Sequence, residues 1–217
     1  MTGLLKKDWY ILLEMKRMIV MILLIAVLLA FGNPGGETFV VSYVTFVAAI
    51  MALTTITQDE SGKGISFLMT MPVTREKYVQ EKYLLGIMLG FFGWLFSFVV
   101  IVAALFFQQK EITFEFLWSC LIYLPILLMV LALMIPVQLK FGGDRGRIVI
   151  IVVVALGIVS VMLFLRTAEI LHWDLSGASD FVYRNQYLIY GLFILGFLAV
   201  LWISYRISLK VMRNKEL

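Results

Sequence analysis

The stretch that decides the fold is QDESGKGISFLMTMPVTREKYVQEK, residues 58–82, the longest polar interruption in an otherwise apolar chain. Its centre, residues 65–71, is apolar but far too short to cross a bilayer. We therefore expect a short amphipathic helix at the membrane surface. The apolar side chains of such a helix lie on two adjoining faces, with Ile65, Leu68 and Met69 on one and Phe67 and Met71 on the other.

A sharp corner follows this segment and lets a second helix begin at once. Pro72 lacks a backbone donor and forces the residue before it away from helical geometry, so the first helix has to end there. Thr74 is a good N-cap residue, and Glu76 falls in the first turn, where the helix dipole favours an anion. The sequence predicts a short surface helix, a corner, and a second helix that runs into the membrane.

The composition indicates a membrane protein. Of the 217 residues, 62% are hydrophobic and 15% are charged, and the mean hydropathy is +1.00. These values exclude a soluble domain. The single cysteine, Cys120, lies in an apolar run, which excludes a disulfide framework and a cysteine-based metal site. The net charge of +4 comes from basic residues spread among loops, so it does not indicate binding to nucleic acid.

The apolar runs predict an all-α membrane protein, a single domain over residues 1–217 that crosses the plasma membrane several times. An interfacial helix at 4–15, with Trp9 and Tyr10, precedes the first span. The six predicted transmembrane helices lie at about residues 18–32, 39–57, 83–107, 116–138, 148–165 and 187–205. Fifteen of the eighteen Lys and Arg residues fall on one side of these spans. The positive-inside rule therefore predicts that both termini and the 58–82 stretch are cytoplasmic.

Two of the spans carry a face of small residues. In span two this face is also weakly polar, and it indicates either close helix packing or the lining of a pathway. In span three the small residues recur every three or four positions, which is typical of a packing face. The face in span two consists of Ser42, Thr45, Ala49 and Ala52, and that in span three of Gly86, Gly90, Gly93 and Ser97.

Later in the chain, three features lead to predictions about helix ends and loops. Span four contains Pro125 and Pro136, which predict a kink or an early end. Residues 140–147, KFGGDRGR, predict a solvated turn, because the Gly-Lys-Ser/Thr ending of a phosphate-binding loop is missing. Residues 166–186 mix aromatic and acidic side chains, which suits a segment folded against the outer membrane surface, and the one histidine, His172, lies there.

None of the six predicted spans contains Asp, Glu, Lys, Arg or His. Ion-coupled transporters, proton pumps and voltage sensors depend on such groups inside the membrane, so these classes are disfavoured. A membrane enzyme needs a nucleophile with its base or a metal with its ligands, and one histidine cannot make such a site. If the protein moves a substrate, the free energy has to come from a partner.

The 58–82 stretch also carries a family pattern. Glu60 and Gly62 follow the second span, an apolar segment comes next, then the corner Met71-Pro72-Val73-Thr74-Arg75, and Lys82 precedes the third span. This pattern resembles the permeases of ABC-2 type exporters, and the layout of six spans with cytoplasmic ends is similar too. A bare six-span chain of this length looks like the small branch that includes exporters of cytolytic peptides, such as phenol-soluble modulins, and antimicrobial-peptide resistance systems.

The resemblance implies two permeases, identical or related, and two ABC ATPase subunits on separate chains, since no Walker motif occurs here. ATP and Mg²⁺ would bind to those subunits, so this chain would hold no cofactor and catalyse no reaction itself. An exposed apolar segment ringed by charge is typical of a helix that docks into a partner's groove. The residues expected to couple the permease to the ATPase are Glu60, Lys63, Ile65, Phe67, Leu68, Met69, Met71 and Arg75.

The translocation path is expected between two permeases, along spans two and five, because span two carries small hydroxyl-bearing residues and the family uses these helices there. The residues predicted for the path and interface are Ser42, Thr45, Ala49, Ala52, Thr55, Gly157 and Ser160. A route without charges suits export of an amphipathic peptide or a lipid-like molecule. The rival interpretation is a non-transporting immunity or scaffold protein that binds an antimicrobial peptide. An ion channel is disfavoured, because no charged ring or filter-like loop occurs.

Overall fold

The structure, a computed structural model, describes residues 2–32, 36–60, 64–70, 73–170 and 186–215. Within these ranges every regular element is an α-helix, which confirms the all-α class predicted from the sequence. The helices are α1 (Thr2–Glu14), α2 (Lys16–Gly32), α3 (Glu37–Glu60), α4 (Gly64–Thr70), α5 (Arg75–Phe107), α6 (Phe114–Phe141), α7 (Gly143–Ile170) and α9 (Gln186–Asn214).

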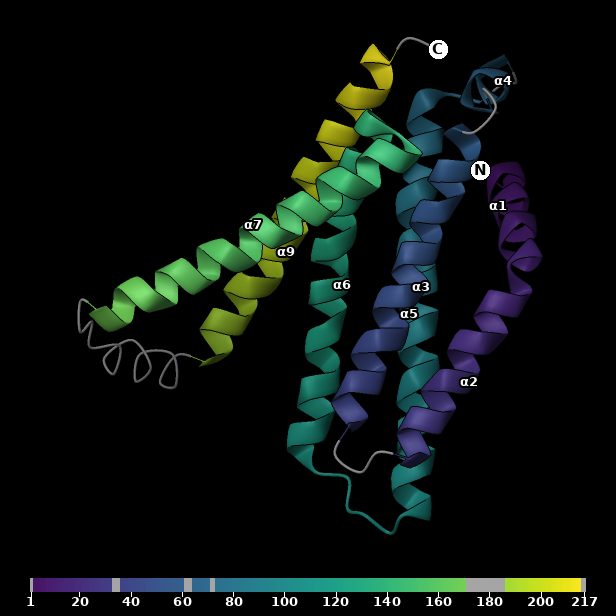
Figure 1. The fold of residues 1–217 in the computed structure, drawn as a ribbon. Coiled ribbons are helices and arrows are strands. Elements are labelled where there is room, and N and C mark those ends of the chain that lie inside the picture. The colour runs from purple at the N-terminus through teal and green to yellow at the C-terminus, as the bar shows by residue number, and fades with distance from the viewer. Residues whose placement is uncertain (1, 33–35, 61–63, 71–72, 171–185, 216–217) are drawn as a thin grey trace.

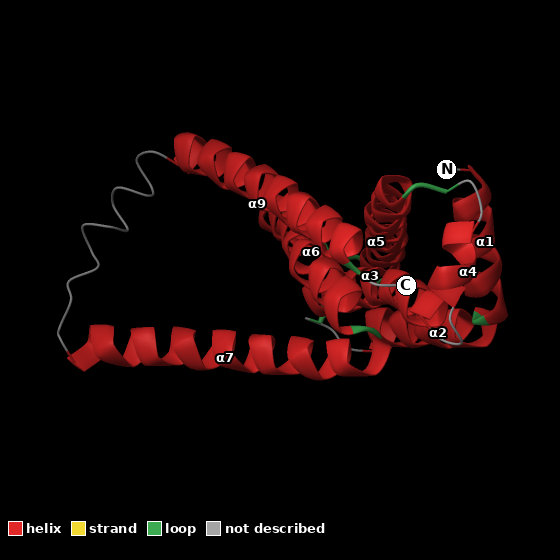
Figure 2. Cartoon of the chain, turned by 90° about the horizontal axis from the view of Figure 1, so that it is seen from above, coloured by secondary structure: helices red, strands yellow, loops and turns green. Residues whose placement is uncertain are grey.

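Helices α3, α5 and α6 form the centre of a bundle (Figure 1). The most extensive contact joins α3 to α5, while α9 packs along α6 and α2 packs against α3 and α5. Helix α7 begins beside α6 and then runs away from the bundle, as two views at right angles show (Figures 1 and 2). The start of α1, the end of α9 and α4 lie at one end of the bundle, which is called the α4 end below.

Four segments of the described chain are long and apolar enough to cross a membrane: Glu37–Glu60, Arg75–Phe107, Phe116–Phe141 and Leu195–Asn214. They correspond to the second, third, fourth and sixth predicted spans. The first predicted span forms α2, which has only 17 residues, and the fifth lies within α7. At the α4 end the helices run further than the predicted spans, since α3 continues to Glu60 and α5 already begins at Arg75.

Close packing around α5 depends on its glycines. A Cβ atom added at Gly90 would lie 2.5 Å from the Leu127 side chain of α6, and one added at Gly93 would lie 2.6 Å from the Ala48 side chain of α3. Larger residues at these positions would force the helices apart. The interpretation of this face of span three as a packing face is confirmed.

Of the two outcomes predicted for the prolines of α6, a kink or an early end, the early end is wrong. It runs from Phe114 to Phe141 through Pro125 and Pro136. The physical reason is a buried stripe with a spacing of four, which packs into the core on both sides of Pro136 and keeps the helix in place although each proline removes a backbone donor. The stripe consists of Leu127, Leu131, Ile135 and Leu139.

The turn predicted at 140–147 is also wrong, because most of it is helical. Helix α6 ends at Phe141 and α7 begins at Gly143, so one residue, Gly142, makes the corner. Its φ of 79° lies in the left-handed region that only glycine adopts readily, and its N–H closes α6 by donating to the Gln138 carbonyl at 3.0 Å. The segment predicted to fold on the outer surface, residues 166–186, begins within α7, which continues to Ile170. His172 lies outside the described residues.

Candidate coupling site

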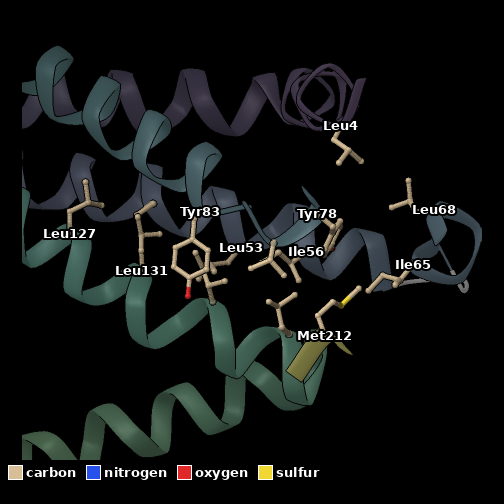
Figure 3. Packing of buried hydrophobic residues seen from close by; sticks show 14 residues of the cluster. Leu4, Leu53, Ile56, Ile65, Leu68, Tyr78, Tyr83, Leu127, Leu131 and Met212 are labelled. Atoms are coloured by element: carbon tan, nitrogen blue, oxygen red, sulfur yellow. The ribbon is translucent and has the colours of Figure 1, made fainter. Parts of the chain in front are cut away.

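Helix α4 has one face on the hydrophobic core at the α4 end of the bundle. Ile65 is 4% exposed and Leu68 is 8% exposed, and both belong to the cluster that contains Tyr78 of α5 and Met212 of α9 (Figure 3). Burying a side chain of this size contributes roughly 1.5–3 kcal/mol. The inner face therefore attaches α4 to its own chain.

The outer side of α4 carries Phe67, which is 64% exposed, while Met69 is half-buried against the core. The sequence predicted that the whole apolar segment would be exposed to a partner, and for Ile65 and Leu68 this is wrong. A helix of seven residues is unstable alone, and it persists here because these two side chains are buried. Lys63 and Met71, also predicted as coupling residues, lie outside the described residues.

A cavity of about 620 Å³ opens beside α4. Phe67 and Leu68 line it from α4, and Lys7 and Asp59 bring charge to it from α1 and α3. A partner that contacts Phe67 would therefore reach this cavity as well. The other lining residues are Gly3, Leu4, Gln58, Gly64, Val73 and Lys77.

A group of charged side chains is buried between α1, α3 and α5. At its centre lies Lys82 of α5, which is 1% exposed and pairs with Asp8 of α1. The Lys82 Nζ also lies 2.8 Å from Asp59 Oδ2 and donates to Thr55 Oγ1 at 3.0 Å. The Tyr78 hydroxyl donates to the same Asp59 oxygen at 3.1 Å. One ammonium group thus joins three helices.

Two further side chains complete this buried charge cluster, which consists of Lys7, Asp8, Asp59, Glu81 and Lys82. Lys7 pairs with Asp59, and its Nζ lies 3.0 Å from Asp8 Oδ1. Glu81 is 1% exposed and its Oε2 lies 3.6 Å from the Lys82 Nζ. Neither Glu81 oxygen has a hydrogen-bond partner among the described residues. The cluster therefore sets three carboxyl groups against two ammonium groups.

The pKa of Asp8 shows how these charges balance. Burial alone would raise this pKa, but the attraction and hydrogen bond from Lys82, followed by those from Lys7, outweigh burial and hold the pKa below the ordinary value of 3.8. Asp8 is consequently ionised at neutral pH. Helix α1 is therefore attached to α3 and α5 by charge pairing as well as by its apolar residues.

The sequence pattern predicts Asp59 and Lys82 as charges of a loop, and this cluster is therefore absent from the prediction. A usable signal was present. Counting in fours from the N-cap Thr74 places Tyr78 and Lys82 on the same helical face as the packing glycine Gly86. A lysine on a packing face has to be buried, and a buried lysine requires an acidic partner.

Glu60 and Arg75, the predicted coupling residues that flank α4, both bond to the C-terminal end of the chain. Glu60 pairs with Lys215. The Arg75 guanidinium donates to the carbonyl of Met212 at 3.0 Å and to that of Arg213. Their coupling role remains a prediction, but each already has a partner within its own chain.

The small-residue face of span two lies mostly inside the bundle. Thr45, Ala49, Ala52 and Thr55 are all buried by the chain itself, and Ser42 is half-buried and donates to the Phe39 carbonyl at 2.8 Å. This burial favours helix packing, the first of the two interpretations of that face. By contrast, Gly157 and Ser160 are exposed on α7. The part of these residues in a path or dimer interface remains a prediction.

Residues 3–213 match the family model described as ABC-2 family transporter protein. The chain belongs to the ABC-2 transporter family. No curated protein and no solved structure matches it. Family membership together with several apolar helices of spanning length shows a multi-pass membrane protein with a transporter permease role. Permeases of this family are typically non-catalytic membrane subunits that work with an ABC ATPase.

Proposed function

We propose that this ABC-2 permease belongs to an ATP-driven exporter and that α4 receives the motion of the separate ATPase subunit. The observation that carries the proposal is the two-sided character of α4. Its inner face is buried in the core through Ile65 and Leu68, while Phe67 points outward beside an open cavity. An exposed aromatic next to a cavity is suited to a partner that inserts its own side chains there.

The surroundings of α4 suit the transmission of force. Helices are stiff units, and displacing a well-packed face moves the elements behind it. Behind α4 lie α1, α3 and α5, which the buried charge cluster joins through Lys82. Movement of α4 would therefore be passed to helices that cross the membrane.

The proposed assembly contains two ATPase subunits and a second permease, identical or related. Support for a second permease comes from α7, which carries large exposed apolar side chains, among them Ile151 at 67% and Leu156 at 63%. Beside them lie the exposed Gly157 and Ser160, whose small size permits close helix contact. We propose that α7 faces the second permease or the translocated molecule.

The proposed substrate is an amphipathic peptide or a lipid-like molecule. Four charged residues of the buried charge cluster, Lys7, Asp8, Asp59 and Lys82, lie near the α4 end and are paired with one another, so they are not free to bind a hydrophilic ion. Helix α9 also presents large exposed apolar side chains, including Leu195 and Trp202. Surfaces of this kind bind the apolar face of an amphipathic molecule while its polar face stays in water.

Copurification tests the role of α4. Tagged permease is purified in mild detergent from the host membrane, and the ATPase that accompanies it is identified by mass spectrometry and assayed for ATP hydrolysis. The variant Phe67→Asp should lose the ATPase, because a charge replaces the exposed apolar contact. A full complement of ATPase on Phe67→Asp would refute docking at α4.

The matched control is Phe114→Asp, which changes a phenylalanine that is 78% exposed at the start of α6, away from α4. This variant should retain the ATPase. Leu68→Asp is a poor test by comparison, because Leu68 is buried and its replacement would also disturb the core. Both Phe variants should remain in the membrane fraction at the level of the unaltered protein.

A further inference from the structure

The C-terminal segment, residues 212–215, contacts the chain just after α4. Arg75, the first residue of α5, donates to the carbonyls of Met212 and Arg213. These carbonyls belong to the last turn of α9, where backbone acceptors lack partners within the helix. The Arg213 side chain in turn pairs with Glu76. Three polar contacts thus join the start of α5 to the end of α9.

The same segment also contacts the chain just before α4. Lys215 pairs with Glu60, the last residue of α3, and donates to the Leu139 carbonyl at 2.9 Å. Between these two sets of contacts, Met212 is fully buried in the core cluster that also contains Ile65 of α4 (Figure 3). The C-terminal segment therefore touches both flanks of α4 and the cluster on which α4 rests.

We infer that Arg213 and Lys215 are positioning residues for α4, and that the C-terminal segment fixes the resting position of α4 relative to α9. The inference about position stands on these contacts alone, whereas its consequence for coupling rests on the proposed function. Arg213 and Glu76 are 63% and 51% exposed. Exposed ion pairs are weak, so this contact can break and re-form as α4 moves.

The test uses the full chain in lipid nanodiscs with Cys120→Ala as background. Spin labels are placed at Thr70→Cys on α4 and at Ile203→Cys on α9, both exposed positions, with excess unlabelled permease to suppress distances between copies. The variants are Arg213→Glu, the exchanged pair Arg213→Glu with Glu76→Arg, and the control Lys210→Glu. Lys210 is exposed on α9, and no ion pair joins it to another described residue.

We expect Arg213→Glu to move the label distances toward a longer, broader distribution, because two carboxylates then face each other. The ratio of molecules with the longer label distance to molecules with the original distance should rise roughly fivefold, as expected when an exposed ion pair is made repulsive. The exchanged pair should restore the original distribution, and Lys210→Glu should leave it unchanged. Rescue by exchange is a result that general destabilisation would not produce.

Two results would overturn the inference: a distribution in Arg213→Glu that equals that of the unaltered chain, or a change that the exchanged pair does not reverse. The second readout is ATP hydrolysis by the complex with its ATPase. If the ATPase binds, Arg213→Glu should keep the ATPase bound yet lose roughly fivefold in substrate-stimulated hydrolysis, and the exchanged pair should regain it. If no ATPase binds the unaltered permease, the proposed function fails, and the label distances still decide the inference.

Discussion

Replacing Lys82 by methionine tests whether the buried charge cluster holds the α4 end together. Methionine has nearly the same length and volume as lysine but carries no charge, so the change removes one ammonium group and little else. Lys82 is 1% exposed, and its partners Asp8 and Asp59 are 0% and 5% exposed. After the change Asp8 and Asp59 share the single ammonium group of Lys7, and Glu81 loses the ammonium group that lies 3.6 Å from its Oε2.

The expected loss follows from this burial. Removing one partner of a buried ion pair costs about 3–5 kcal/mol, because the remaining charge stays in a medium that solvates it poorly. For a chain of this length that corresponds to a fall in the unfolding midpoint on the order of 10 °C. The double variant Lys82→Met with Asp8→Asn should regain part of the loss, since it also removes one of the stranded charges.

The assay is thermal unfolding in detergent, followed by size-exclusion chromatography of the fluorescently tagged protein. The control is Lys6→Met, which removes an exposed lysine from α1 next to Lys7. Lys6→Met should leave the midpoint within about 2 °C of the unaltered chain, as for most exposed substitutions. If Lys82→Met matches Lys6→Met, the three helices are not joined by charge and the reasoning is refuted.

Four further predictions use other parts of the chain. Gly90→Ala should cost about 1–3 kcal/mol in the same unfolding assay, whereas Gly157→Ala should be neutral in a single permease, because no atom of its own chain lies within 4 Å of the added Cβ. Because the folded-state pKa of Asp8 is lowered, its contribution to stability is present above its unfolded pKa and is lost as the pH falls through its folded pKa, so the deficit of Asp8→Asn should shrink below about pH 4. Cysteines at Thr45 and Ala52 should crosslink between permeases, or react with permeant reagents in some nucleotide state, if span two lines the path; complete inertness would assign this face to packing alone. ATP hydrolysis by the complex should rise with amphipathic helical peptides, and stimulation by sugars or metal ions alone would refute the substrate class.

Local patterns in the sequence were enough to predict the helices around α4. Thr74 caps α5 as predicted, and its side-chain oxygen accepts the Lys77 N–H at 3.3 Å. The short apolar helix also lies where predicted, at Gly64–Thr70. These features depend on residues within a few positions of one another, which one sequence displays directly.

Partners far apart in the chain could not be predicted in the same way. Lys7 and Asp59 are 52 positions apart, and Arg213 and Glu76 are 137 positions apart. Periodicity can show that Lys82 lies on a packing face, but not which helix that face meets, and so it cannot supply the acidic partner. The burial of Ile65 and Leu68 was missed for the same reason, since the cluster that contains them brings together residues of α1, α3, α5, α6 and α9.

The contacts around α4 differ in strength, and the difference determines what moves when α4 is pushed. Moving α4 relative to α3 and α5 would expose the inner face of α4 or break the buried charge cluster. Breaking the cluster alone would cost about 3–5 kcal/mol. Toward α9, the outermost contact is the exposed pair of Arg213 and Glu76, which contributes about 0–1 kcal/mol. A force on α4 is therefore passed to α3 and α5 through the stronger contacts, and the exposed pair of Arg213 and Glu76 is the first contact with α9 to break. If the proposed function holds, the movement that follows ATP binding should accordingly appear between α4 and α9, and this is the distance that the two spin labels measure.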